Sequence, residues 1–122
     1  MRILIADDNE GVRRGVVAIL ASKTSWEICG EAADGIEAVQ KARELLPDVI
    51  LLDISMPGLN GLETARQLQR EVSSARVLVM SQHDPLGLTP IAFEAGARGC
   101  LDKSRLATDL LSAIELIAET QD

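Results

Sequence analysis

Three nearly continuous aliphatic runs dominate the sequence, and each is followed by a segment of helical periodicity. The runs cover residues 3–6, 49–52 and 77–80, and they show little alternation between apolar and polar positions. Strands with one solvated face alternate, whereas strands covered on both faces by crossover helices do not. The runs therefore predict a parallel sheet in an α/β protein.

The segments between the runs carry apolar residues every three or four positions, as on one face of a helix. The stripes are Val12, Val16, Ile19 and Leu20; Ile36, Val39, Ala42 and Leu46; Leu62, Ala65, Leu68 and Val72; and Leu106, Leu110, Ala113, Ile114 and Ile117. Two weaker apolar runs, 26–30 and 99–101, complete five predicted strands. Asp34 with Glu37, and Asn60 with Glu63, have the spacing of helix N-caps. Strand–helix alternation with right-handed crossovers predicts an open sheet with helices on both faces.

The composition fits one domain over residues 1–122 and limits its partners. With 12 basic and 19 acidic residues the net charge is −7, which disfavours direct nucleic-acid binding, because phosphate contacts need clustered cations. No apolar run approaches the roughly 20 residues of a membrane helix, and no secretory signal is visible, so we expect no membrane contact and a cytoplasmic location. Cys29 and Cys100 are far apart, which favours two small buried apolar residues over a disulfide or zinc site.

Polar side chains follow the predicted strands where each strand ends. Asp7 and Asp8 follow the first strand, Asp53 ends the third, Ser81 the fourth and Lys103 the fifth. Ligand sites of open α/β sheets form beyond the carboxyl ends of the strands. If these strands are neighbours, three carboxylates, a hydroxyl and an ammonium converge there.

Three close carboxylates repel one another, and a divalent cation would relieve this. Two unit charges ~4 Å apart interact by about 4 kcal/mol at an effective dielectric near 20. Oxygen ligands without His or Cys favour Mg²⁺. The alternative for Asp7 and Asp8 is N-capping of the first helix, which needs only one of them. Asp53 is then the candidate nucleophile towards phosphorus, with Lys103 neutralising charge and Ser81 donating a hydrogen bond.

The chain resembles the receiver domain of bacterial two-component response regulators, in details the NarL/FixJ class. The resemblance is carried by ILIADDNEGVR (3–13), GEAADGIEA (30–38), PDVILLDISMPGLNGLE (47–63), VLVMS (77–81), AFEAGARG (92–99) and Lys103. It implies a flavodoxin-like (βα)₅ three-layer sandwich with strand order 2-1-3-4-5. It also implies that a helix-turn-helix output domain, common after such receivers, is absent from these 122 residues.

The resemblance assigns roles. Asp53 would take a phosphoryl group from a histidine kinase. Asp8 and Asp53 would bind Mg²⁺ directly, Asp7 through water, and Ser55 through its backbone carbonyl. Lys103 would pair with the phosphoryl group and Ser81 would move towards it, which shifts an output face made by the fourth helix, fifth strand and fifth helix. The chain would catalyse only its own phosphorylation and dephosphorylation, could dimerise when phosphorylated, and would reach DNA only through the missing domain.

Two departures from the family pattern matter. Cys100 stands where an aromatic residue usually couples to the Ser or Thr, so we expect the signal to leave through backbone and helix movement. In the segment 81–97, Gly87 and Pro90 predict a short fourth helix capped by Thr89 and starting at Pro90, after a mobile loop. His83 in this loop is either an ordinary exposed histidine or, with Ser55, a residue that tunes dephosphorylation.

Two other functions are compatible with parts of the pattern. A haloacid-dehalogenase-like phosphatase also uses Asp, Mg²⁺, Ser or Thr, and Lys on a parallel sheet. Its nucleophile, however, ends the first strand in a D-x-D pattern, whereas this strand ends in D-D-N. The second alternative is a binding module that keeps the receiver fold but does not respond to phosphate.

Overall fold

Five parallel strands form one sheet of order β2-β1-β3-β4-β5, as predicted. This is seen in a computed structural model that describes residues 1–56, 61–82 and 85–119. The elements in chain order are β1 (Arg2–Ala6), α1 (Glu10–Leu20), β2 (Glu27–Ala32), α2 (Gly35–Leu45), β3 (Val49–Asp53), α3 (Gly61–Glu71), β4 (Arg76–Ser81), α4 (Pro85–Glu94), β5 (Gly99–Asp102), a short 3₁₀ helix η1 (Lys103–Arg105) and α5 (Leu106–Glu119).

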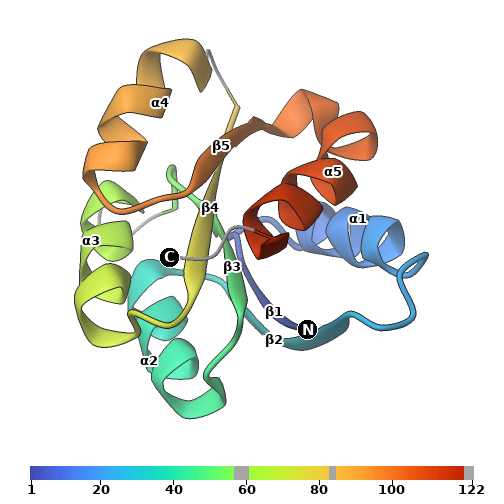
Figure 1. Ribbon diagram of the computed structural model, residues 1–122, viewed down its shortest axis with the longest axis horizontal. Coiled ribbons are helices and arrows are strands. Elements are labelled where there is room, and N and C mark those ends of the chain that lie inside the picture. The colour runs from blue at the N-terminus through green and yellow to red at the C-terminus, as the bar shows by residue number, and fades with distance from the viewer. Residues whose placement is uncertain (57–60, 83–84, 120–122) are drawn as a thin grey trace.

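Helices cover both faces of the sheet, so the chain folds as three layers (Figure 1). Successive residues of a strand point to opposite faces, and the central strands divide their aliphatic side chains accordingly. Leu4, Ile50, Leu52, Val77 and Val79 pack beneath α2, α3 and α4. On the other face, beneath α1 and α5, lie Ile3, Ile5, Leu51, Leu78 and Met80. Burial on both faces explains why these strands show no polar alternation.

The N-cap predicted at Asp34 is confirmed, with one difference in the return contact. Oδ1 of Asp34 accepts a hydrogen bond from the backbone N–H of Glu37 at 2.8 Å. The Glu37 carboxylate accepts in turn from the backbone N–H of Ala33 at 2.7 Å, one residue before the cap. The companion cap at Asn60 lies outside the described residues.

Two residues of the stripe predicted on α2 lie at the surface. Ile36 is 64% exposed and Leu46 is 62% exposed, whereas Val39 and Ala42 are buried as predicted. Ile36 follows the buried Gly35 by about 100° around the helix, which turns it away from the sheet. Leu46 lies beyond the helix in the left-handed region, with φ of 49°. The other three stripes are buried or partly buried against the sheet.

The start predicted for the fourth helix is wrong, because α4 begins at Pro85 rather than at Pro90. Proline is favoured at the first helical position, where its missing N–H would be unpaired anyway. Pro85 therefore begins the helix, and Pro90 is accommodated inside it. Residues 86–88, expected in a mobile loop, are helical. His83 lies outside the described residues. In the described ranges, no helix is both long and apolar enough to cross a membrane.

Candidate functional site

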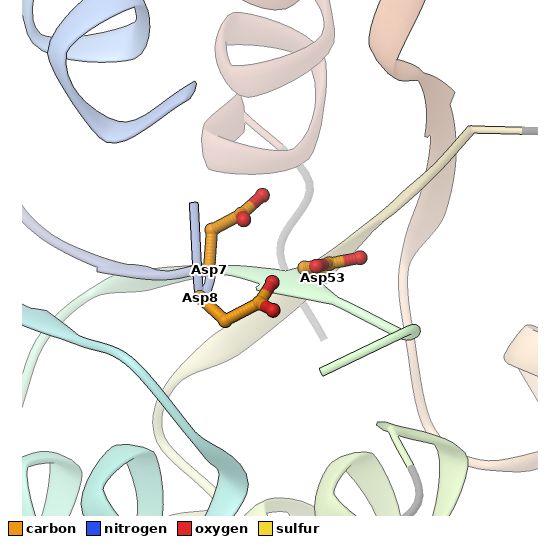
Figure 2. A group of neighbouring side chains, drawn as sticks. All are labelled: Asp7, Asp8 and Asp53. Atoms are coloured by element: carbon orange, nitrogen blue, oxygen red, sulfur yellow. The ribbon is translucent and has the colours of Figure 1, made fainter. Parts of the chain in front are cut away.

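The carboxyl ends of β1 and β3 bring three carboxylates together, as the sequence predicts. Asp7 and Asp8 follow β1, and Asp53 is the last residue of the adjacent β3. One carboxylate oxygen of each lies within 4.8 Å of the others. In Figure 2 the carboxylate of Asp8 points towards Asp53, and Asp7 lies beside Asp8.

Asp53 is buried, and its two carboxylate oxygens have different neighbours. Oδ1 accepts hydrogen bonds from the backbone N–H of Ser55 at 3.0 Å and from its hydroxyl at 2.8 Å. Oδ2 lies 3.1 Å from Nζ of Lys103. Only 1% of the Asp53 residue surface is exposed, so the ammonium and the Ser55 donors replace water as its polar partners.

Lys103 forms ion pairs with two carboxylates of the cluster, those of Asp7 and Asp53. Its Nζ lies 2.7 Å from Oδ2 of Asp7 as well as 3.1 Å from Oδ2 of Asp53, and its side chain is 9% exposed. The sequence predicts the pairing of Lys103 with Asp53 but not its contact with Asp7. Lys103 begins η1 directly after β5, so the strand order carries it across from the fifth strand to the end of the first.

Asp7 is fully buried, and its charge is costly despite these contacts. Burial is the main cause that raises the pKa of the Asp7 carboxyl, and the nearby Asp53 adds to the rise. Lys103 and the backbone N–H of Asn9, which donates to Oδ1 at 2.8 Å, act in the opposite direction. For Lys103 burial also disfavours the charge, but the two carboxylates outweigh it and the pKa of the ammonium is raised. The buried ammonium and the two buried carboxylates therefore stabilise one another's charges, while burial opposes them.

Neither Asp7 nor Asp8 caps the first helix. The N-cap of α1 is Asn9, whose side chain accepts a hydrogen bond from the backbone N–H of Val12 at 3.1 Å. This removes the structural alternative for the two carboxylates. Asp8 is exposed, and within the described part of the chain no side chain or backbone group pairs with its carboxylate.

The donor set fits a hard divalent cation. Asp8 offers an exposed carboxylate, Asp53 offers a buried one, and the excess negative charge of the cluster is only partly met by Lys103. Carboxylate oxygens with access to water suit Mg²⁺, which keeps several waters in its shell. The cluster can thus hold such an ion, and among the residues that the structure describes it includes no softer ligand that would favour zinc or copper.

Ser81 and Cys100 lie on the strands that border the cluster. Ser81 is the last residue of β4, is 4% exposed and pairs in register with Asp102 of β5. Since Asp53 is opposite Met80, Ser81 lies one residue further along the strand direction than Asp53. Cys100 is half-buried on β5 and packs against the apolar layer under α4. The sequence alone did not show which face Cys100 takes.

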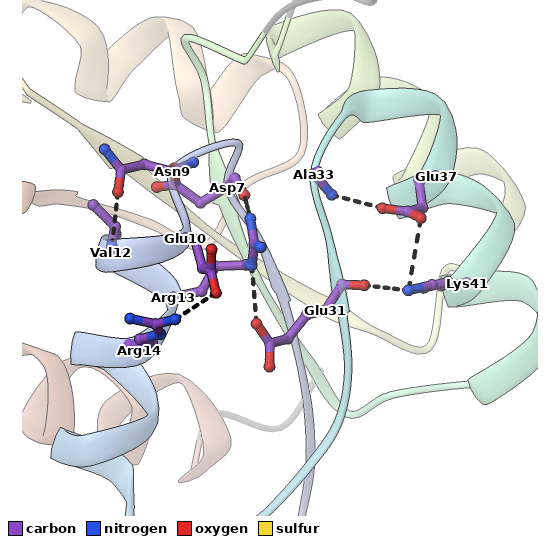
Figure 3. Close-up of polar contacts among 10 residues, drawn as sticks. All are labelled: Asp7, Asn9, Glu10, Val12, Arg13, Arg14, Glu31, Ala33, Glu37 and Lys41. Atoms are coloured by element: carbon purple, nitrogen blue, oxygen red, sulfur yellow. Dashed lines mark hydrogen bonds and ion pairs between the residues drawn. The ribbon is translucent and has the colours of Figure 1, made fainter.

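Arg13 is a contact residue of the cluster that its sequence position did not reveal. From α1 its guanidinium donates to the backbone oxygen of Asp7 at 2.6 Å and pairs through Nε with Glu31 of β2 at 2.9 Å. Figure 3 shows Arg13 between these two groups, and Lys41 of α2 reaching the backbone oxygen of Glu31 from the other side. The available signal was its place one turn into the helix that follows Asp7 and Asp8.

The cluster borders a surface cleft of about 370 Å³, lined by Val12, Gln82, Lys103 and Ser104. The cleft lies between Val12 near the start of α1 and Gln82 after β4, and Lys103 forms part of its wall.

The sequence matches one protein family, the response regulator receiver domain, over residues 3–115. The curated protein "transcriptional regulatory protein LiaR" of Bacillus subtilis is 41% identical over 115 residues, which cover 93% of this chain and 54% of that protein. "Transcriptional regulatory protein DegU" of Brevibacillus brevis is 37% identical over 119 residues, covering 98% of this chain and 50% of that protein. The chain thus spans about half the length of these relatives.

Solved structures agree with the fold. The signal receiver domain of the putative response regulator NarL from Mycobacterium tuberculosis superposes with a TM-score of 0.90 at 35% identity, covering 98% of this chain and 97% of that one. The response regulator domain of Thermotoga maritima CheB gives a TM-score of 0.90 at 31% identity, with 100% and 98% covered.

Proposed function

Because this chain belongs to the response regulator receiver domains, the phosphorylation-dependent switches of two-component signalling, we propose that Asp53 is its phosphoacceptor. The observation that supports this most directly is the buried Asp53 carboxylate with Lys103 Nζ 3.1 Å from Oδ2 and two further carboxylates beside it. A carboxylate needs no general base to attack phosphorus, so the site has to supply charge neutralisation and orientation.

The proposed reaction moves a phosphoryl group from a phosphohistidine to Asp53 and needs only a proton from solvent in addition. An oxygen of Asp53 forms a bond to the phosphorus of a phosphohistidine, and the phosphorus–nitrogen bond breaks as the imidazole keeps the electron pair and takes up a proton from solvent. Ser55 orients the acceptor, because its N–H and hydroxyl both hold Oδ1. The ammonium of Lys103 lies beside Oδ2, where it can pair with a phosphoryl oxygen.

Mg²⁺ is the proposed cofactor, held by Asp8 and Asp53, with Asp7 acting through water and with the backbone carbonyl of Ser55 as a further ligand. When bound, the ion neutralises part of the charge on the phosphoryl oxygens. Support comes from the exposed Asp8 carboxylate, with which no described residue pairs, and from the three neighbouring carboxylates, which share the single ammonium of Lys103.

Phosphorylation then acts as a charge switch. A phosphoryl group brings negative charge and strong acceptor oxygens to Asp53, which draws Lys103 away from Asp7 and gives the Ser81 hydroxyl a new acceptor. Asp53 and Ser81 end β3 and β4, and Lys103 directly follows β5, so their movement reaches α4 and α5, the proposed output face. A shift from 1:99 to 99:1 needs about 5.5 kcal/mol of differential stabilisation, which a few charge-assisted contacts could supply.

Cys100 and His83 complete the proposed set. With a thiol in place of an aromatic ring, we expect β5 and α4 to move without rotation of a large side chain at Cys100. We keep Ser55 and His83 as candidates that tune dephosphorylation, since Ser55 lies at the exposed rim beside Asp53.

The partners of the whole protein follow from the same proposal. The phosphodonor is a histidine kinase, phosphorylation could promote a homodimer, and DNA is reached through an output domain outside these 122 residues. The curated relatives called transcriptional regulatory proteins are about twice as long as this chain, which supports a transcriptional output. The free thiols of Cys29 and Cys100 fit the reducing cytoplasm.

Labelling and turnover assays distinguish this proposal from the other two functions. Incubated with acetyl phosphate and Mg²⁺, the chain should gain one phosphoryl group and then lose it slowly, without continuous hydrolysis of small phosphoesters. Multiple turnover on phosphoesters would favour a phosphatase. A chain that binds neither Mg²⁺ nor a phosphoryl group would favour a module that uses the fold without phosphate.

A further inference from the structure

We propose that Arg13 is a positioning residue of the metal site, which sets the orientation of Asp8 by holding the peptide bond between Asp7 and Asp8. This inference rests on the proposed magnesium site and adds a residue to it. Arg13 itself contacts neither carboxylate. Its guanidinium donates at 2.6 Å to the backbone oxygen of Asp7.

The peptide plane makes this contact consequential for Asp8. The carbonyl of Asp7, the N–H of Asp8 and the Cα of Asp8 lie in one plane. A hydrogen bond that fixes the carbonyl therefore also fixes the direction in which Asp8 leaves the strand. Asp7 has other anchors, because its N–H donates to Ala32 at 2.9 Å and its side chain meets Asn9 and Lys103.

Asp8 has no comparable anchor of its own. Its side chain is exposed, and no described residue pairs with its carboxylate, so backbone direction alone points it towards Asp53 (Figure 2). Arg13 is thus the side chain that most directly determines where the exposed ligand stands. Outer partners of metal ligands commonly change metal affinity by 10–100-fold when removed.

Arg13 is itself held in place and largely neutralised. Its Nε pairs with Glu31 at 2.9 Å, and its side chain is only 18% exposed. Glu31 is steadied through its backbone oxygen by Lys41, which also pairs with Glu37 (Figure 3). Through Arg13, Glu31 and Lys41, this network connects the Asp7–Asp8 peptide to β2 and α2. It therefore holds the end of β1 from the β2 side of the sheet, whereas Lys103 contacts the cluster from the β5 side.

The sign of the mutational effect separates positioning from simple electrostatics. If charge alone matters, removing the Arg13 cation near the metal site should strengthen Mg²⁺ binding. If Arg13 positions Asp8, removing its hydrogen bond to the Asp7 carbonyl should weaken Mg²⁺ binding. Arg14 offers a matched control on the same helix, because it is also an arginine and pairs with Glu10 at 2.7 Å, but both side chains are mostly exposed.

The test is a Mg²⁺ titration followed through the backbone amide resonances of Asp8 and Ser55 in wild type, Arg13→Met, Arg14→Met and Glu31→Gln. We expect Arg13→Met to weaken Mg²⁺ binding about tenfold or more, Arg14→Met to stay within about twofold, and Glu31→Gln to fall between them. Binding by Arg13→Met as tight as wild type or tighter would overturn the positioning role. Equal weakening by Arg14→Met would overturn it too.

Two further measurements keep folding and function apart. Urea unfolding without Mg²⁺ shows whether Arg13→Met is folded. If it is not, Arg13→Lys replaces it, and this variant should bind Mg²⁺ more weakly than wild type but by less than tenfold, because one ammonium can still donate to the backbone oxygen of Asp7. A folded Arg13→Lys that binds Mg²⁺ as tightly as wild type would contradict the inference. A wild type without a saturable Mg²⁺ response would instead refute the magnesium site itself, and the positioning role with it.

Discussion

Lys103 Nζ lies 2.7 Å from Oδ2 of Asp7, although the two residues follow strands at different positions of the sheet. The contact makes Lys103 the counter-ion of a buried carboxylate in the resting site, in addition to its proposed role towards a phosphoryl group. On phosphorylation of Asp53, Lys103 would exchange one anionic partner for another. Lys103 would therefore serve as a counter-ion in the resting site and in the proposed phosphorylated site in turn.

Replacing Lys103 with Met should destabilise the metal-free chain and tighten Mg²⁺ binding. Two buried carboxylates would lose their cation, which costs roughly 3 kcal/mol when one partner of a buried pair is removed. Without the Lys103 ammonium, Mg²⁺ would meet less electrostatic repulsion and would bind the carboxylates more tightly. Urea unfolding with and without Mg²⁺ measures both effects.

Lys23→Met is the control for this change. Lys23 is 3.4 Å from Glu115 at the surface, and such exposed pairs contribute about 1 kcal/mol or less. Equal stability of Lys103→Met and wild type in the absence of Mg²⁺ would show that the ammonium does not balance the cluster.

Stability should depend on pH through Asp7, with a sign set by its raised pKa. A carboxyl whose pKa is higher in the folded chain than in the unfolded one stabilises the fold only while it is protonated. That contribution is complete below the ordinary value of 3.8 and is lost as pH rises through the folded pKa. Without Mg²⁺, Asp7→Asn should therefore be more stable than wild type at pH 7.

The stability advantage of Asp7→Asn should shrink as the solution is acidified towards pH 3.8. Parallel urea titrations of both chains across this range measure the difference. An Asp7→Asn chain less stable than wild type at pH 7, or a difference independent of pH, would contradict the cause assigned to the shift.

Gly61 should tolerate no side chain, because α3 starts against the loop that carries Ser55. A Cβ at Gly61 would lie 2.2 Å from the Cα of Ile54 and 2.5 Å from its oxygen. Backbone atoms cannot move aside as a side chain can, so Gly61→Ala should cost about 2 kcal/mol and slow phosphorylation by displacing Ser55.

Gly15→Ala is the matched control, since a Cβ there meets nothing within 4 Å. Alanine is the better helix former, so this change should stabilise α1 by up to about 1 kcal/mol and leave the phosphorylation rate unchanged. Thermal unfolding and acetyl phosphate kinetics report both. Wild-type kinetics and stability in Gly61→Ala would show that the close approach is unimportant.

Cys100→Ala should keep the response to phosphorylation. Cys100 packs half-buried in the layer under α4, so losing its sulfur should cost about 1 kcal/mol of stability without removing a moving part. Amide chemical shifts of α4 and β5, with and without acetyl phosphate and Mg²⁺, report the switch. Loss of these shift changes in a folded Cys100→Ala chain would give the thiol a specific role.

The sequence predicted the parts of the site that follow from strand ends. Residues after parallel strands meet at one edge of the sheet, so the convergence of Asp7, Asp8, Asp53 and Lys103 needed only the strand order. The contact of Arg13 with the Asp7 carbonyl could not be predicted, because it depends on how α1 sits over the end of β1. Every residue carries a backbone carbonyl, so the sequence does not show which carbonyl will accept a hydrogen bond.

The helices show where local patterns stop being informative. Ile36 fits the apolar spacing of α2 but lies at the surface, because the sheet contacts a different side of that helix. In the fourth helix two prolines compete as the first residue, and residue preferences alone favoured Pro90. The helix begins at Pro85, where the missing N–H would have no partner anyway, and Pro90 lies within it.

The most direct test of the account is intact-mass measurement after incubation with acetyl phosphate and Mg²⁺, on wild type and on Asp53→Asn. We expect wild type to gain one phosphoryl group and Asp53→Asn, which keeps the size of the side chain, to gain none. A wild type that gains no phosphoryl mass, or an Asp53→Asn chain labelled as fully as wild type, would contradict it.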